Sequence, residues 1–147
     1  MTEKTYSVEY TLAANLAARS RTQASIRPDP AMASVTVLTV PKGKRLIIKD
    51  IYIDSAPTTD IVAEIYKNRD TRVLITDPMS GLIATNPAKP KYKPLVFDEH
   101  ETLHIYVVNL AAVGASDESD VFYMKVEEVP IGKAPSGGGW VSKLKIS

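Results

Sequence analysis

The sequence predicts an all-β protein that folds as a single sandwich of two sheets. Short stretches rich in valine, isoleucine, threonine and tyrosine recur along the chain, and such residues are typical of strands. Between them lie segments of glycine, proline and acidic residues, which are typical of turns. At 147 residues the chain is long enough to bury one core. It has no cysteine, so disulfides and thiolate metal sites are excluded.

The first predicted strand shows the clearest pattern. Tyr6, Val8, Tyr10 and Leu12 alternate with polar residues, as in a strand with one buried face. Further strands are predicted over residues 34–40, 45–54, 61–67, 71–76, 95–97, 102–109 and 121–129. The segment 45–54 has apolar residues at both odd and even positions, which predicts a central strand. About seven to nine strands of this kind indicate a β-sandwich that resembles a jelly roll.

The connections between these strands carry turn signals. Val40-Pro41-Lys42-Gly43 fits a type I turn, with proline at i+1 and glycine at i+3. The polar run 68–70 predicts a tight turn, and residues 115–120 an acidic loop. Several prolines within 77–94 predict that this segment is neither a helix nor a central strand. The alanine-rich stretch 12–20 leaves a short helix open as an alternative.

Three regions are expected along the chain: an N-terminal strand and arm over 1–33, the sandwich over 34–129, and a C-terminal arm over 130–147. Glycines at 137–139 form a hinge before Trp140, the single tryptophan, and tryptophan is frequent at interaction hot spots. We therefore expect oligomer or partner contacts at the following residues of the two arms: Tyr6, Tyr10, Arg19, Arg21, Arg27, Trp140, Lys143, Leu144 and Ile146. The alternative, that the tail folds back as an edge strand of its own sheet, stays open.

The string His100-Glu101-Thr102-Leu103-His104 matches the zinc-protease motif H-E-x-x-H. On a helix both imidazoles could hold one zinc ion. On a strand the two histidines would be about 13 Å apart, too far for one metal. The β-branched and aromatic run 105–108 favours a strand, so His100 is expected in a turn and His104 on a strand face. A zinc hydrolase remains a remote alternative.

No other motif indicates catalysis, and we expect no catalytic residue, no metal and no cofactor. The acidic run 117–120 lacks the spacing of a calcium loop. The basic run 89–94 is local and the net charge is only +1, so nucleic acid is not expected as a partner. No stretch is long and apolar enough to span a membrane, and the N-terminus does not fit a signal peptide. Synthesis in a host cytoplasm is therefore expected.

Two strand phrases, residues 40–51 and 101–109, resemble strands of jelly-roll proteins from phage and virus particles, such as capsid decoration (cement) proteins and tail-fibre modules. His100 stands where that pattern has glycine. The resemblance implies a virion structural protein that is not an enzyme. Its expected partners are further copies of itself, most often in a trimer, and other capsid or virion proteins.

A different class of function stays open as the alternative. A β-sandwich can also bind carbohydrate or a receptor, as tail-fibre modules do. Tyrosine rings would then serve as stacking platforms, and the candidates are Tyr52, Tyr66, Tyr92 and Tyr106. An exposed, coplanar pair of these rings in a groove would favour this alternative.

Overall fold

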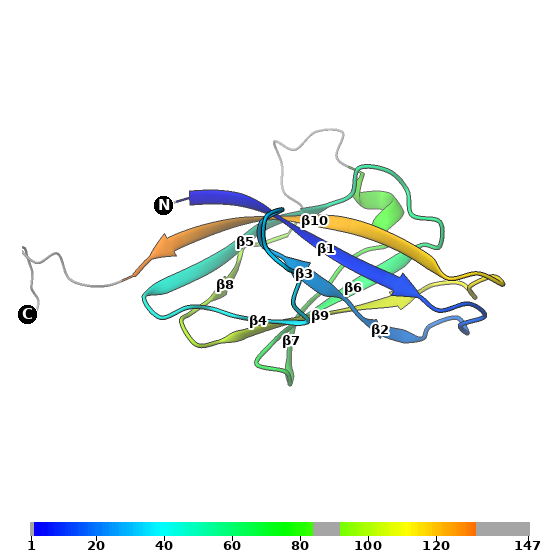
Figure 1. Ribbon diagram of the computed structural model, residues 1–147, viewed down its shortest axis with the longest axis horizontal. Coiled ribbons are helices and arrows are strands. Elements are labelled where there is room, and N and C mark those ends of the chain that lie inside the picture. Colours follow the sequence, from blue (N-terminus) through cyan, green and yellow to red (C-terminus); the bar gives the residue numbers. More distant parts are fainter. Residues whose placement is uncertain (1, 84–91, 132–147) are drawn as a thin grey trace, which may run out of the picture.

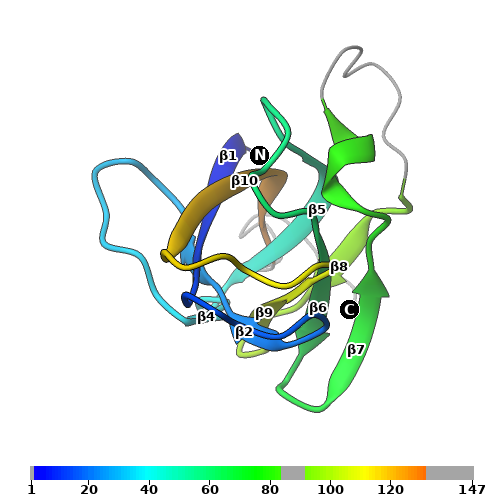
Figure 2. The same cartoon turned by 90° about the vertical axis from the view of Figure 1, so that its right-hand side faces the viewer.

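The computed structural model describes residues 2–83 and 92–131, which form two antiparallel sheets packed face to face (Figure 1). A view turned by 90° shows the two layers, with β1, β10 and β5 above β4, β9 and β6 (Figure 2). The predicted all-β sandwich is confirmed. The described residues form ten strands, slightly more than expected, and one short 3-10 helix.

The strands divide evenly between the sheets. Sheet A has the order β3 (Ser25–Arg27), β1 (Thr2–Leu12), β10 (Glu118–Pro130), β5 (Lys44–Tyr52) and β8 (Leu95–Phe97). Sheet B has the order β2 (Arg21–Gln23), β9 (Thr102–Asn109), β6 (Ile61–Lys67) and β7 (Thr71–Ile75), and β4 (Val37–Thr39) also pairs with β9. The chain changes sheet at most of its connections.

The strand pairs are nested along the chain. The first strand, β1, pairs with the last, β10. Next inward, β2 and β4 pair with β9, and then β5 pairs with β8. The innermost pair is the hairpin of β6 and β7. The first and last described strands, β1 and β10, therefore lie side by side within sheet A.

The core lies between the sheets and is built from alternate residues. In β1 the predicted inward residues are confirmed, because Val8 and Leu12 are buried while their neighbours are not. Phe122 and Phe97 are fully buried between the layers. In a strand successive side chains point to opposite faces, so each strand of a two-layer sandwich places every second residue in water.

A bulge explains the mixed pattern of β5. Lys125 pairs with Asp50 and Val126 with Ile48, so Lys49 lies between them without a partner. An extra residue of this kind reverses the alternation. Ile48 before it and Ile51 after it therefore both point into the core. Leu46, Ile48 and Ile51 therefore share the inner face, whereas Ile47 and Tyr52 lie on the outer face. β5 is an interior strand, as predicted.

The turn before β5 differs from the prediction by one residue. The amide of Lys44 donates to the carbonyl of Pro41 at 3.2 Å, so the turn spans 41–44 and Gly43 occupies position i+2. The φ of Gly43 is +80°, which type II turns require at i+2 and glycine supplies without strain. The predicted type I turn over 40–43 is therefore wrong.

The alternative of a helix over 12–20 is also wrong. Asn15 and Arg19 have φ values of 60° and 65°, which a right-handed helix does not contain. The backbone bonds across the molecule instead, from Asn15 to Gly114 at 2.7 Å and from Arg19 to Asn109 at 2.6 Å. These long-range bonds outweigh the weak helical preference of the alanines.

The N-terminal residues are not an arm outside the sandwich. Within 1–33, β1 and β3 belong to sheet A and β2 to sheet B, so the expected boundary at residue 33 does not separate an arm from the core. The segment 77–94 also needs correction, because Met79–Leu82 form a 3-10 helix, η1, with Met79 and Leu82 buried. In the acidic segment 115–120, residues 118–120 already belong to β10.

Candidate interaction surface

The outer face of sheet B carries an unusual concentration of aromatic and apolar side chains. The register places Tyr106 of β9 beside Glu64 of β6, and Tyr66 of β6 beside His104 of β9. We call this surface the aromatic face. Its outward residues include Arg21, Gln23, Val37, Thr39, Val62, Glu64, Tyr66, Arg72, Ile75, Thr102, His104, Tyr106 and Val108.

Two tyrosines and one arginine form the centre of the aromatic face. The rings of Tyr66 and Tyr106 are perpendicular, at 86°, with centroids 5.5 Å apart. The guanidinium carbon of Arg21 lies 3.7 Å from the Tyr106 centroid and 4.9 Å from that of Tyr66. A cation over a ring face is attracted to the negative face of the π system. The pairing of β2 with β9 makes this contact possible, because it brings Arg21 opposite Val108.

Glu64 fixes the position of two cations on this face. Its carboxylate accepts hydrogen bonds from Arg21 Nε at 3.2 Å and from Arg72 Nη1 at 3.4 Å. The Glu64 side chain is only 13% exposed, whereas those of Arg21 and Arg72 are 48% and 49% exposed. The two guanidinium groups are therefore held in place by a nearly covered anion and remain available to a partner.

Apolar side chains surround this centre. Val62 and Val108 are half-buried neighbours on β6 and β9. Val37 of β4 and Ile75 of the edge strand β7 are 38% and 47% exposed. An apolar surface edged by polar groups is the usual character of a protein interaction site.

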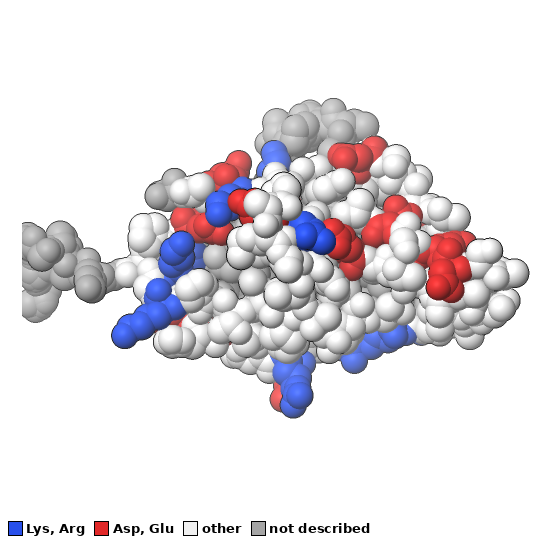
Figure 3. All heavy atoms as spheres, in the orientation of Figure 1, with Lys and Arg blue, Asp and Glu red and all other residues white. Residues whose placement is uncertain are grey.

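The outer face of sheet A is different, and we call it the charged face. Its outward residues include Glu3, Glu9, Arg27, Lys49, Asp50, Lys125 and Glu127. Lys49 Nζ lies 3.6 Å from a Glu3 oxygen and 3.9 Å from a Glu127 oxygen. Figure 3 shows acidic and basic side chains interspersed where β1, β5 and β10 run. Mixed exposed charges of this kind favour contact with water.

A pocket opens at the end of the sandwich where β10 ends and β5 begins, on the left in Figure 1. We call it the end pocket, and its volume is about 210 Å³. The residues that line it are Lys4, Tyr6, Pro28, Met32, Leu38, Thr39, Pro41, Lys44, Leu46 and Glu128. Most of its wall is apolar, and its polar residues come from β1, β4, β5 and β10.

The polar groups of the end pocket form a chain of contacts. The Tyr6 hydroxyl donates to Glu128 Oε2 at 2.6 Å, and Lys4 Nζ lies 3.4 Å from Glu128 Oε1. Burial raises the pKa of Tyr6 far above its ordinary value, and the hydrogen bond to Glu128 and its charge raise it further. Tyr6 is therefore a neutral hydrogen-bond donor to Glu128 at physiological pH.

The structure separates the predicted contact residues of the N-terminal segment into two groups. Tyr6 and Tyr10 point into the sandwich and are 2% and 6% exposed, so little of either is left for a partner. Burial and the carboxylates of Asp120, Asp60 and Glu118 raise the pKa of Tyr10.

The three arginines lie at the surface. Arg21 belongs to the aromatic face, and Arg19 lies in the loop before β2. Arg27 Nε binds Glu9 Oε2 at 2.9 Å on the charged face, and this carboxylate raises the pKa of Arg27. The predicted contacts Trp140, Lys143, Leu144 and Ile146 lie outside the described residues.

The motif at 100–104 forms a turn and the start of β9, as predicted, and not a helix. His100 has a φ of 69°, the left-handed region that glycine adopts most readily. His104 is 8% exposed, and its Nε2 lies 2.9 Å from Thr102 Oγ1. Within 2–83 and 92–131, no three histidine or carboxylate side chains are grouped to hold one metal ion.

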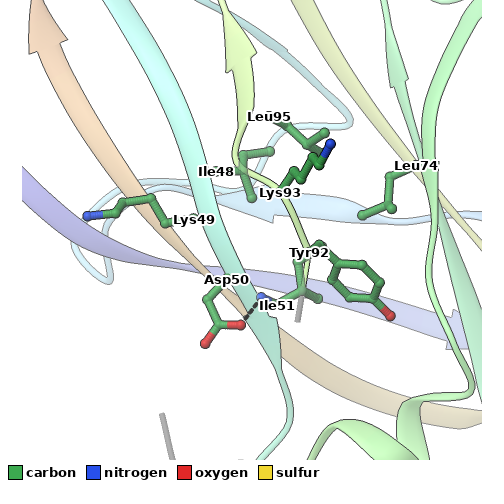
Figure 4. Close-up of a pocket in the computed structure, with 8 residues that line it drawn as sticks. All are labelled: Ile48, Lys49, Asp50, Ile51, Leu74, Tyr92, Lys93 and Leu95. Carbon is green, nitrogen blue, oxygen red and sulfur yellow. Dashed lines mark hydrogen bonds between the residues drawn. The ribbon is translucent and has the colours of Figure 1, made fainter. Parts of the chain in front are cut away.

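The four tyrosines of the carbohydrate alternative do not form a coplanar platform. Tyr66 and Tyr106 are perpendicular, and Tyr52 stacks on Tyr123 at 5.5 Å and 28°, so each ring covers a face of the other. Tyr92 closes the seam between β7 and β5, where it points toward Leu74 (Figure 4). Its hydroxyl accepts a hydrogen bond from the amide of Asp77 at 2.8 Å. The remaining space there is about 10 Å³, room for a single water.

Several residues of the aromatic face were not predicted as contacts. Glu64, Arg72 and Ile75 were treated only as parts of strands. A signal was present in the sequence, because four of the positions of β6 and β9 that alternate with the core residues are valine or tyrosine, namely Val62, Tyr66, Tyr106 and Val108. A solvent-facing strand position more often carries a polar residue.

No protein-family model matches this chain, and no curated protein is similar to it. In the part of the chain that the structure describes, no helix has the length and apolar character needed to cross a membrane.

Proposed function

We propose that this protein is a structural, non-enzymatic component of a virus or phage particle, of the capsid decoration or outer shell type, that self-associates through the aromatic face. The observation that carries the proposal is the difference between the two outer faces. One is charged and suited to water, and the other presents a Tyr66–Tyr106 pair, Arg21 and half-exposed aliphatic side chains. Tyrosine and arginine are enriched at the centres of protein interfaces.

The strand order supports the jelly-roll part of this proposal. The strand pairs are nested, with β1 and β10 as the outermost pair and β6 and β7 as the innermost. This order corresponds to one long hairpin that is folded over itself. Jelly rolls with two packed sheets occur in capsid proteins and also in lectins. The two faces support self-association, and the resemblance of residues 40–51 and 101–109 to virion strands supports the assignment to a particle.

The partner that fits the aromatic face best is a second copy of this chain. The face presents two half-exposed guanidinium groups next to tyrosine rings and to the apolar Ile75, so it offers both halves of a cation–π contact. A patch that complements itself permits an isologous contact, which pairs two copies about a two-fold axis. The trimer expected from the resemblance requires in addition that the aromatic face meets a different patch of the next copy.

The test compares two apolar residues on edge strands. Ile75 lies on β7 at the margin of the aromatic face, and Val96 lies on β8 at the margin of the charged face, with exposures of 47% and 40%. We expect Ile75→Lys to weaken self-association by about 1.5–3 kcal/mol, the value of burying one such side chain. Val96→Lys should leave the oligomer unchanged. The measurement is light scattering during size-exclusion chromatography over a range of concentrations.

A monomeric wild-type chain, or equal effects of the two substitutions, would contradict the proposal. A chain that lacks residues 136–147 examines the predicted C-terminal arm separately. Loss of assembly in this truncated chain would support a role for the arm. Retained assembly would remove the arm from the proposal and leave the aromatic face as the interface.

A further inference from the structure

We propose that the end pocket binds the indole side chain of Trp140 from the C-terminal segment of the same chain. The occupant is therefore a segment of this protein, held in cis, and the pocket acts as a latch for it. The end pocket is separate from the centre of the aromatic face at Arg21, Tyr66 and Tyr106. The inference does not depend on the proposed self-association.

The described chain ends beside the pocket. Pro130 pairs with Lys44, and the amide of Ile131 donates to the carbonyl of Gly43 at 2.8 Å. Lys44 lines the pocket, and so does Glu128, three residues before Ile131. The segment that follows residue 131 therefore starts at the edge of the pocket.

The tether between this point and Trp140 has a suitable length. Trp140 lies nine residues after Ile131, and nine residues extend at most about 30 Å. Glycines 137–139 precede Trp140, and glycine-rich sequences of nine residues span about 15–18 Å on average. A short tether gives a bound group an effective concentration in the millimolar range, which favours binding within one chain.

The size and the walls of the pocket suit one large aromatic side chain. Its volume of about 210 Å³ is below the range of about 300–1,000 Å³ typical of sites for drug-sized ligands. Leu38 and Leu46 supply aliphatic walls, and Met32 stands at the rim with 54% of its surface exposed. A methionine thioether makes favourable contacts with aromatic rings, so an indole would cover a side chain that is otherwise open to water.

The polar groups of the pocket suit the indole N–H. Glu128 already accepts from Tyr6 and pairs with Lys4, but a carboxylate has about four acceptor positions. The indole nitrogen is a donor only. Tryptophan usually places its apolar ring in a cleft while its N–H finds an acceptor. The pocket offers both parts, an apolar wall and a charged acceptor.

Intrinsic fluorescence tests this directly, because Trp140 is the only tryptophan of the chain. In the folded full-length protein we expect a blue-shifted emission and a loss of access for a soluble quencher, relative to the urea-unfolded chain. Met32→Asp places a charge at the rim and should shift the emission to the red. Val35→Asp is the matched control, since Val35 is exposed on the same connection but does not line the pocket. It should leave the emission unchanged.

The cis arrangement has its own readout. The emission of the wild-type chain should be independent of protein concentration. Mixing the Met32→Asp chain with a chain that lacks residues 136–147, whose pocket is intact and empty, should produce no blue shift. Circular dichroism confirms that each variant is folded. Three results would overturn the proposal. They are a solvent-like Trp140 emission in wild type, equal emission shifts in Met32→Asp and Val35→Asp, and a blue shift when the two chains are mixed.

Discussion

Each sheet has a pair of tyrosines on its outer face, and the surroundings of the two pairs differ. Tyr66 and Tyr106 on sheet B lie under Arg21 and beside aliphatic side chains. Tyr52 and Tyr123 on sheet A stack on each other next to Asp50 and Lys125. Burial, followed by the charge of Asp54 and a hydrogen bond to it, raises the pKa of Tyr123. The same residue type on the same kind of strand can therefore belong to an interface or to a solvated surface, depending on its neighbours.

The largest expected effect comes from removing each tyrosine pair. Replacing Tyr66 and Tyr106 by serine should weaken self-association by about 2 kcal/mol or more for each hot-spot side chain, which is about 30-fold in Kd for each. Replacing Tyr52 and Tyr123 by serine should leave Kd unchanged. Sedimentation or light scattering over a dilution series measures both. If replacing the sheet A pair raised the Kd of self-association equally, the distinction between the two faces would be contradicted.

A smaller effect is expected when the central cation of each face is removed. Arg21→Gln eliminates the contact with two rings and one ion pair, and should lower the free energy of unfolding by about 1 kcal/mol. Lys49→Gln removes a cation that bridges Glu3 and Glu127 without a ring contact, and should cost less. Denaturant titration of both variants at low and high salt distinguishes the two effects on the free energy of unfolding. The Lys49 effect should vanish at high salt, because salt screens exposed charges, and the Arg21 effect should persist in part.

The smallest expected effect concerns pH on the aromatic face. Burial lowers the pKa of His104, Arg69 lowers it further, and Asp70 opposes them. The unfolded state, with a pKa near 6.5, therefore binds the proton more readily than the folded state. The stabilisation is complete above about pH 6.5 and is lost as the pH falls through the lower folded pKa.

His104→Gln should remove this part of the pH dependence of unfolding. Urea titrations of wild type and variant at several pH values measure it. If the free energy of unfolding depends on pH below 6.5 equally in wild type and variant, the assignment of this pH dependence to His104 is contradicted.

Much of the fold follows from local patterns. The strands over 61–67 and 102–109 have the predicted bounds, because each is a run of β-branched and aromatic residues with turn residues on either side. The short strands β2 and β3 were missed, because three residues are too few to show a period. The turn before β5 was misplaced by one residue, because the position of Gly43 depends on the pairing of β5 with β10.

Much less of the candidate surface could be predicted from local sequence patterns. Arg21 was expected as a contact, yet its partners Glu64 and Tyr106 come from distant strands, and only the register of β2, β9 and β6 brings them together. The end pocket also combines residues from β1, β5 and β10 with the connection after β3.

For β1 the sequence by itself determined which side chains enter the core, because its apolar and polar residues alternate without interruption. It also determined that 100–104 is a turn and a strand, since β-branched and aromatic residues follow it. Only the tertiary structure decided which outer face is aromatic and where a pocket opens. Both depend on which strands pair and in what register, and long-range packing fixes these choices.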